Sequence, residues 1–286
     1  MYVGIDFGLS NLDAVATAAP EAPLHTWRMV TLRGHHEPSA ALVRAVLDAL
    51  AVAPNDVRLL AVTGGRHRLL SAADGFALHH ANELESVGCG ALRLAREARA
   101  ELQAATVASC GSGTAVVAVR GRHVNHISGS AVGGGTLLGL ARLLIGSMDP
   151  REVDALALQG EANAIDLSLR DAVGGAIGRL PADATAVNFG RVPLLERADF
   201  ARADLAAAIV TMVAQVVSIT AVNAARAEAL FPIVFVGHLM DMSSARRVVE
   251  AVAQLYAADV LIPNRPGYAT AIGALLISAE KAHAAA

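Results

Sequence analysis

The sequence carries the same local pattern twice, and this repeat restricts the fold more than any other feature. An apolar strand, a glycine turn and a second strand occur over residues 2–19 and again over residues 106–128. In both halves the pattern continues into further strands and helices. A repeat on this scale predicts a duplicated α/β fold. We expect the halves to span residues 1–104 and 105–286 and to enclose a cleft, since no low-complexity linker separates them.

Hydrophobic periodicity, together with glycine and proline breaks, predicts the individual elements. The expected strands cover residues 2–7, 13–19, 24–32, 59–62, 107–109, 114–119, 121–128, 233–236 and 260–262. The expected helices cover residues 38–52, 81–104, 133–146, 204–229, 243–253 and 268–284. A smaller helical region is expected between residue 146 and about residue 200.

Composition excludes several classes of protein. Of the 286 residues 54% are hydrophobic and 17% are charged, which suits a large packed core and not a disordered chain. A net charge of −3 offers no basic field for nucleic acid or for an anionic membrane surface. Apolar runs are interrupted well before twenty residues, so we expect no membrane span. Two cysteines and an N-terminus without signal-peptide features favour a cytoplasmic protein.

The first motif that could carry chemistry is the turn after the first strand. Asp6 ends an apolar strand, and Gly8, Ser10 and Asn11 follow it. Backbone N–H groups and the Ser10 hydroxyl can bind nucleotide phosphates, and Asp6 can hold Mg²⁺ through water. The alternative is a plain hairpin turn with Gly8 at positive φ.

A second turn follows the matching strand of the second half. It contains Gly111, Ser112, Gly113 and Thr114, and the same reasoning assigns it to phosphates. It too could be a plain hairpin. Two such turns at matching places are what a nucleotide clamped between two halves requires, because each half then contributes one.

Two further glycine segments are candidates for ligand contact. Gly133, Gly134 and Gly135 open a predicted helix, where three glycines are costly unless something must approach closely. Gly237 and His238 follow an apolar strand, and this turn could lie under a base or a ribose. An ordinary strand-to-helix connection is the alternative for the second segment.

Carboxylates at the start of the predicted helix 81–104 are candidates for a general base. Glu83 and Glu85 lie two residues apart and therefore point to different faces of a helix. A favourable interaction with the helix dipole is the alternative role. The pairs His35-His36 and His79-His80 lack helical metal spacing and the cysteines form no CxxC, so we expect no metal other than Mg²⁺.

Taken in chain order, these motifs resemble those of type II pantothenate kinases, members of the acetate kinase/hexokinase/actin-like superfamily. The segments that carry the resemblance are GIDFGLSN, TGG at 63–65, NELE at 82–85, SCGSGTAV, GSAVGGGTLLGL, IDL at 165–167, VNFGRV, VFVGH and TAIGALL. They run through nearly the whole chain. The resemblance implies a duplicated actin-like, ribonuclease-H-like ATPase fold with a nucleotide cleft between its halves.

The resemblance also implies an activity and roles for single residues. It implies a homodimeric kinase that transfers the γ-phosphoryl group of ATP to a primary hydroxyl of pantothenate. Asp6 would lie at Mg²⁺, Glu83 would be the catalytic base, and Gly237 would approach the adenosine. The turns at 8–11 and 111–114 would hold the phosphates. Residues that would contact the nucleotide–substrate junction or the substrate are His126, Ser130, Gly133, Gly134, Gly135 and Thr136.

Three positions depart from the family pattern. Leu9 and Ser10 stand where the family has Gly and Thr, and Asp13 stands where it has a lysine. An acidic residue near a triphosphate is unfavourable by Coulomb's law. His126 stands where the family has an arginine that grips pantothenate, and a histidine cannot reproduce a bidentate grip. A kinase for another alcohol or sugar, or a weakened nucleotide-binding homologue, therefore remains an alternative.

The long helix predicted from Asp204 to about Ala229 bears on assembly. It has more apolar positions than one buried stripe needs, which predicts a two-fold dimer through this helix and the segment 187–192. The alternative is a central helix that the rest of the chain surrounds.

Overall fold

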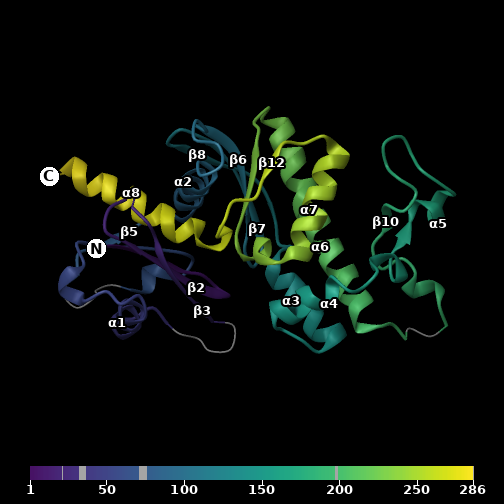
Figure 1. The fold of residues 1–286 in the computed structure, drawn as a ribbon, viewed down its shortest axis with the longest axis horizontal. Coiled ribbons are helices and arrows are strands. Elements are labelled where there is room, and N and C mark those ends of the chain that lie inside the picture. Colours follow the sequence, from purple (N-terminus) through teal and green to yellow (C-terminus); the bar gives the residue numbers. More distant parts are fainter. Residues whose placement is uncertain (21, 32–36, 71–75, 197–198, 286) are drawn as a thin grey trace.

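The computed structural model describes residues 1–20, 22–31, 37–70, 76–196 and 199–285. Two five-stranded sheets follow one another along the long axis of the molecule, and a small lobe around β10 and α5 lies at the far end (Figure 1). His35 and His36 lie outside the described residues, as does the last residue of the strand predicted at 24–32.

The first sheet has the strand order β3-β2-β1-β4-β5. The first three strands form an antiparallel meander, and β4 and β5 continue the sheet in parallel with β1. Their bounds are Tyr2–Phe7 for β1, Asn11–Thr17 for β2, His25–Val30 for β3, Leu59–Thr63 for β4 and Leu78–His80 for β5. All residues of β4 are buried, as expected for a parallel strand covered on both faces.

The second sheet repeats this topology in the order β12-β11-β6-β7-β8. β6, β7 and β8 form the meander, and β11 and β12 run parallel to β6. The bounds are Ala104–Cys110 for β6, Thr114–Arg120 for β7, His123–Ser130 for β8, Ile233–Val236 for β11 and Val260–Leu261 for β12. The duplicated α/β fold expected from the sequence repeat is therefore confirmed.

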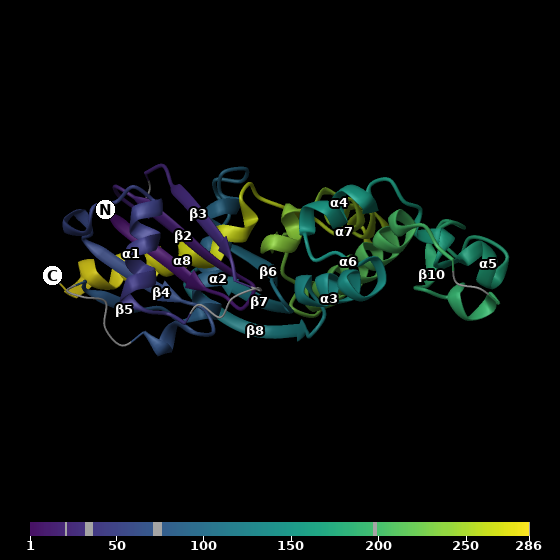
Figure 2. The ribbon, with the colours of Figure 1, turned by 90° about the horizontal axis from the view of Figure 1, so that it is seen from below.

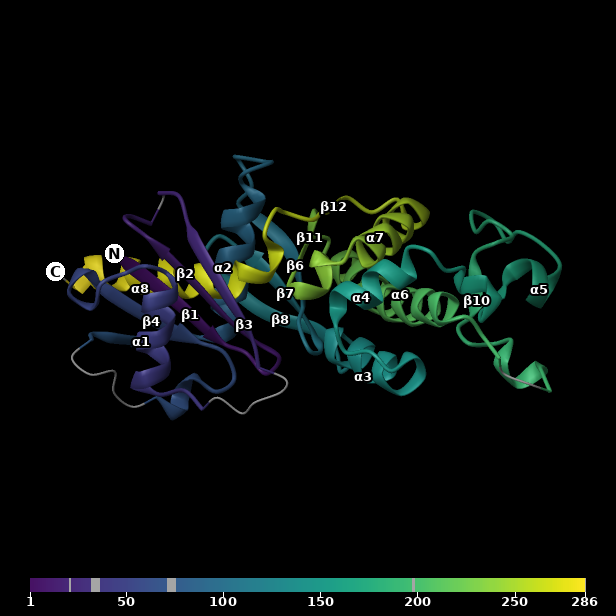
Figure 3. The ribbon, with the colours of Figure 1, turned by 60° about the horizontal axis from the view of Figure 1, so that its bottom comes forward.

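Two helices cross between the sheets. α2 (Glu83–Ala95) packs on the second sheet, α8 (Ala269–Ala285) packs on the first, and the two helices pack against each other (Figure 2). Gly90 and Gly273 allow this close crossing, because a Cβ at either position would overlap the backbone of the other helix. The opposite face of the first sheet is covered by α1 (Ala40–Ala49), which Figure 3 shows with α8 behind.

α6 (Arg202–Ala227) is the central helix of the second half. It packs against β6 and β8 and against α3 (Gly134–Ile145), α4 (Pro150–Ala157) and α7 (Ser243–Tyr256). Neighbours on several sides explain why so many of its positions are apolar. By length and composition α6 could cross a membrane, but 61% of its most apolar window is buried inside the protein, which identifies it as a core helix.

Two predictions about individual elements are wrong. The helix predicted at 81–104 ends at Ala95, where the apolar stripe stops; Arg96 then donates through Nε to the carbonyl of Leu102, and β6 begins at Ala104. The region before residue 200 is not only helical. Besides α5 (Leu169–Val173), it contains a small antiparallel pair of strands, β9 (Leu167–Ser168) and β10 (Thr185–Val187).

Candidate functional site

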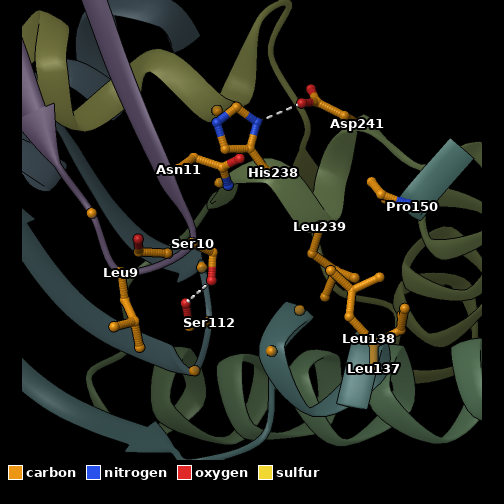
Figure 4. A pocket seen from close by; sticks show the side chains of 18 of the residues that line it. Leu9, Ser10, Asn11, Ser112, Leu137, Leu138, Pro150, His238, Leu239 and Asp241 are labelled. Carbon is orange, nitrogen blue, oxygen red and sulfur yellow. Dashed lines mark hydrogen bonds and ion pairs between the residues drawn. The ribbon is translucent and has the colours of Figure 1, made fainter. Parts of the chain in front are cut away.

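A cavity of about 650 Å³ lies between the two sheets and is lined by both halves of the chain (Figure 4). The predicted site residues among its lining are Asp6, Gly8, Ser10, Asn11, Glu83, Gly111, Ser112, Gly113, Thr114, Ser130, Gly134, Gly135 and Gly237. Gly133, Thr136 and His126 do not line it. The cavity thus collects motifs from separate segments of the sequence.

The two predicted phosphate turns meet across this cavity. Ser10 Oγ, in the turn between β1 and β2, lies 2.6 Å from Ser112 Oγ, in the turn between β6 and β7 (Figure 4). Their predicted position, facing each other across the cleft, is confirmed. Gly8 does not have the positive φ considered for a plain hairpin; it is needed because a Cβ there would lie 2.7 Å from the carbonyl oxygen of Asn11.

The glycines at the start of α3 pack against the second turn. Gly134 and Gly135 donate their backbone N–H groups to the carbonyls of Gly111 and Ser112, at 2.8 and 2.9 Å. Gly133 precedes the helix, and a Cβ there would lie 2.7 Å from the backbone of Gly113. These glycines therefore dock a helix onto the turn, and two of them also face the cavity.

Two residues predicted to contact substrate lie elsewhere. The Thr136 hydroxyl donates to the Ala131 carbonyl and accepts from the N–H of Gly133, so it caps α3. His126 is exposed on β8, the edge strand of the second sheet, and is not part of the cavity wall. Ser130, at the end of the same strand, does line the cavity.

Asp6 lines the cavity, and one of its two carboxylate oxygens is unpaired. Its Oδ1 is buried and has no hydrogen-bond partner within the described chain. Burial, followed by the charges of Asp13 and Glu83, raises the pKa of Asp6 to about 8. Gly64, at φ +91°, makes room for this carboxylate, because a Cβ there would overlap Oδ1.

The surroundings of Asp6 fit a magnesium ion that is held mainly by phosphates and water. Mg²⁺ usually retains several waters and takes one or two protein carboxylates. Within the described ranges no group of three or more His, Cys, Asp or Glu side chains is arranged to hold a metal. A cavity-lining carboxylate with one unpaired buried oxygen, beside the two predicted phosphate turns, is a donor set that suits such an ion.

The structure distinguishes the two candidate bases. Glu83 is the first residue of α2 and lines the cavity, close enough to Asp6 for its charge to raise the pKa of that carboxyl. Glu85 is exposed and does not line the cavity; its backbone N–H donates to the capping side chain of Asn82 at 3.1 Å. The geometry therefore favours Glu83.

A polar cluster that the sequence did not indicate joins the two halves. His238 Nε2 lies 2.9 Å from both carboxylate oxygens of Asp13, and His238 Nδ1 lies 2.6 Å from Asp241 Oδ2. Arg28, on β3, donates to Asp241 at 3.2 Å. We call these four residues the cross-cleft cluster. No local signal could have identified it, because Asp13 and His238 are 225 residues apart.

The far end of the cavity is apolar. Figure 4 shows Leu137, Leu138, Pro150 and Leu239 gathered there, and Met148 and Met242 also line the cavity, together with Arg151 and Asp154 of α4. Gly237 has φ +94°, and a Cβ there would overlap the backbone of Cys110. This largely apolar end can accept an aromatic base, with the two predicted phosphate turns elsewhere along the cavity wall.

The sequence profile of the family described as Fumble matches residues 73–277. The chain belongs to the Fumble family. The match covers most of the chain and includes Glu83, the second turn and the start of α3, whereas the first turn precedes it.

Curated relatives agree with this assignment to the Fumble family. A type II pantothenate kinase of Staphylococcus aureus (strain USA300) is 28% identical over 222 residues, covering 77% of this chain and 83% of the relative. A type II pantothenate kinase of Bacillus cereus is 24% identical over 228 residues, covering 79% of this chain and 82% of the relative. The resemblance to type II pantothenate kinases is confirmed.

Solved structures support the fold of this Fumble-family chain. The activator of the 2-hydroxyisocaproyl-CoA dehydratase from Clostridium difficile, with bound ADPNP, matches with a TM-score of 0.67 at 18% identity, covering 100% of this chain and 97% of that one. A ROK family glucokinase from Streptomyces griseus, in complex with glucose and AMPPNP, matches with a TM-score of 0.61 at 13% identity, covering 98% and 99%. The expected actin-like fold class is confirmed.

The cross-cleft cluster predicts a pH-dependent stability. Burial lowers the pKa of His238, but hydrogen bonds to Asp13 and Asp241 and their charges outweigh it and raise the pKa to about 9. An unfolded histidine loses its proton near pH 6.5, so the stabilisation is complete below that pH and is lost as the pH rises through 9. Between pH 7 and pH 9, the loss at His238 should lower the free energy of unfolding in urea by about 2 kcal/mol. Asp6, whose pKa is raised to about 8, adds a further fall over the same range. His238→Asn should show a clearly smaller fall, and an equal fall in both proteins would contradict the assignment.

Proposed function

We propose that this protein is an ATP-dependent kinase that phosphorylates the primary hydroxyl of pantothenate or of a closely related alcohol. One observation carries the proposal: the two opposed turns, the orphaned Asp6 oxygen and Glu83 all line a single cavity. Relatives named type II pantothenate kinase support the substrate class. Two solved structures of the same fold hold ATP analogues, which supports ATP as the donor.

The geometry supports a division of roles along the cavity. The base of ATP would occupy the apolar end, with its sugar over Gly237, and the triphosphate would pass between the turns at 8–11 and 111–114. Their backbone N–H groups and hydroxyls would donate to phosphate oxygens. Mg²⁺ held through water by Asp6 would neutralise charge on the phosphates.

Glu83 would act on the acceptor. Its carboxylate would take the proton of the acceptor hydroxyl while that oxygen attacks the γ-phosphorus, and ADP would leave with the bridging oxygen. Glu83 is the first residue of α2, and it lines the cavity beside Asp6. The two halves would exclude water by closing around the nucleotide.

The alternatives for the acceptor rest on two observations at the cavity. Leu9, 64% exposed, and Val30, 56% exposed, add apolar surface to its first-half wall. His126, in the position of the family's pantothenate-gripping arginine, lies outside the wall. Both favour the second candidate function, a kinase of the same fold for another small alcohol.

An ADP-release assay tests the proposed function. The purified protein, Mg²⁺ and ATP are combined with pantothenate, pantetheine, pantoate or glucose, and each rate is compared with the rate without acceptor. Pantothenate or one of its two close analogues should stimulate ADP release. Stimulation by glucose alone would favour the second candidate. Nucleotide binding without stimulation by any acceptor would contradict both kinase assignments and favour a nucleotide-binding homologue.

ATP as substrate also agrees with a cytoplasmic location.

We further propose a homodimer. Met212, Val216 and Ile219 on α6 are only half-buried, so part of the apolar surface of this helix stays accessible. The neighbouring lobe carries a set of exposed apolar side chains, namely Val173, Ile177, Val187, Leu194 and Leu195. A surface of this kind is typical of an interface between copies.

Light scattering should therefore report a dimer at micromolar concentration. Substituting Val187 and Leu194 together by aspartate should yield monomers, because charges would enter a desolvated interface. Leu69→Asp is the matched control, since this leucine is comparably exposed but belongs to the first half. A monomeric wild type would contradict the proposal.

A further inference from the structure

The charges around the cavity are unfavourable for a triphosphate unless they are compensated. Among the described residues, five acidic side chains line it: Asp6, Asp13, Glu83, Asp154 and Asp241. The basic lining side chains are Arg28, Arg151 and His238. A triphosphate adds further negative charge, so each neutralised carboxylate matters for its binding.

Asp13 is a deeply buried member of this acidic set. It lies on β2 directly after the first phosphate turn, in register opposite Asp6, and is only 3% exposed. Side chains of residues opposite each other in an antiparallel pair are on the same face of the sheet. The charge of Asp13 accordingly contributes to the raised pKa of Asp6. Solvent screens a charge on such a buried side chain only weakly.

His238 compensates this charge from the other half of the molecule. Both oxygens of Asp13 lie 2.9 Å from Nε2 of the imidazole, which is the geometry of a charge-assisted pair. The ring is held in place on three sides. Nδ1 donates to Asp241, Gly267 packs so closely that a Cβ would overlap the ring, and the Tyr268 ring stands edge-on with its centroid 6.1 Å away.

Two carboxylates, Asp13 at Nε2 and Asp241 at Nδ1, favour a protonated ring, whereas the positive charge of Arg28 opposes it. With the Nδ1 proton donated to Asp241, the Arg28 guanidinium, whose Nη1 is 2.7 Å from Nδ1, donates to the Asp241 carboxylate instead. The two carboxylates, the imidazolium and the guanidinium then carry no net charge. Two of these four groups, Asp13 and Arg28, come from the first half, and the other two come from the second half.

We propose that His238 neutralises Asp13 across the cleft and thereby allows a triphosphate to bind beside this buried carboxylate. His238 is in this role a positioning and charge-compensating residue and not a catalytic one. The inference rests on the proposed function, since it assumes that a nucleotide triphosphate occupies the cavity. It implies that removing the imidazole of His238 weakens triphosphate binding only while Asp13 is present.

A double-mutant cycle tests this dependence. Dissociation constants of Mg²⁺–ATP and of adenosine are measured by calorimetry at pH 8 for the wild type, His238→Asn, Asp13→Asn and the double variant. His238→Asn should weaken Mg²⁺–ATP binding by about tenfold or more, because a bare carboxylate then faces the phosphates. The double variant should return to within about threefold of the wild type. Adenosine affinity should change little in all four proteins, because adenosine carries no phosphates.

His283→Asn is the control, because the imidazole of His283 is also hydrogen-bonded but lies exposed on α8, away from the cavity, where its Nδ1 donates to the Ala279 carbonyl. It should bind Mg²⁺–ATP like the wild type. If circular dichroism shows that His238→Asn does not fold, Asp13→Asn alone decides: it should bind Mg²⁺–ATP at least as tightly as the wild type.

Three results would overturn the proposal. Unchanged Mg²⁺–ATP affinity in His238→Asn would show that Asp13 needs no compensation. A double variant as weak as His238→Asn would indicate that the imidazole binds the phosphates directly. Weaker Mg²⁺–ATP binding in Asp13→Asn would show that the carboxylate is not an obstacle. A wild type that binds neither Mg²⁺–ATP nor adenosine would contradict the proposed function itself, and this proposal with it.

Discussion

Replacing Glu83 by glutamine is expected to lower kcat on the best acceptor by about 10²- to 10⁴-fold, the usual cost of removing a general base. Glutamine keeps the size and the hydrogen-bonding reach of the side chain but cannot accept the proton. The affinity for Mg²⁺–ATP should change little, since Glu83 acts on the acceptor. Steady-state kinetics and calorimetry on the same preparations measure both quantities.

Glu85→Gln is the matched control for this substitution. Glu85 belongs to the same helical turn but is exposed outside the cavity, so its kcat should stay near that of the wild type. The opposite result, with Glu85→Gln inactive and Glu83→Gln active, would reverse the assignment. Full turnover in both variants would mean that neither carboxylate is the base.

Replacing Asp6 by asparagine is expected to lower kcat by about 10²-fold or more, because the oxygen that would orient the hydrated Mg²⁺ loses its charge. The Mg²⁺ concentration for half-maximal activity should rise as well. The free energy of unfolding should not decrease. Since burial raises the pKa of Asp6 to about 8, the native carboxyl is largely protonated at pH 7 without metal, and the neutral amide resembles that form.

This combination of effects distinguishes metal binding from a structural role. Urea unfolding of the metal-free Asp6→Asn variant at pH 7 should give a free energy of unfolding equal to or above that of the wild type. Asp48→Asn, an exposed position on α1, is the control and should change neither kcat nor stability. A strongly destabilised Asp6→Asn variant with an unchanged Mg²⁺ requirement would contradict the assignment.

Local sequence patterns sufficed for much of the fold. β1 and β11 have the bounds predicted for them, because each is a short apolar run that ends at a glycine or at polar residues. The duplication was visible because both halves place a glycine turn between the first two strands of a meander. The two phosphate turns could be paired from the sequence alone, since the same topology puts them at matching edges of two sheets.

Other elements escaped prediction because their signals are weak or distant. The β9–β10 pair is only two and three residues long, and the buried Asp166, which accepts from the Phe189 N–H at 2.7 Å, organises the segment around it. The length of α2 was overestimated because the polar residues after Ala95 do not by themselves specify where a helix ends. Thr136 and Gly133 were assigned to ligands although the α3 cap uses both.

The order of residues was enough to specify the repeated strand–turn–strand units, the family and the turns expected at the phosphates, because these depend on contacts between near neighbours or on motifs read in order. The packing of the two halves was needed to establish which carboxylate faces the cavity, that His126 lies outside it, and that Asp13 has a partner. The physical reason is the same in each case. Whether a charge is exposed, orphaned or neutralised depends on side chains that folding brings from the other half of the chain, and His238 reaches Asp13 only when the two sheets close on one cleft.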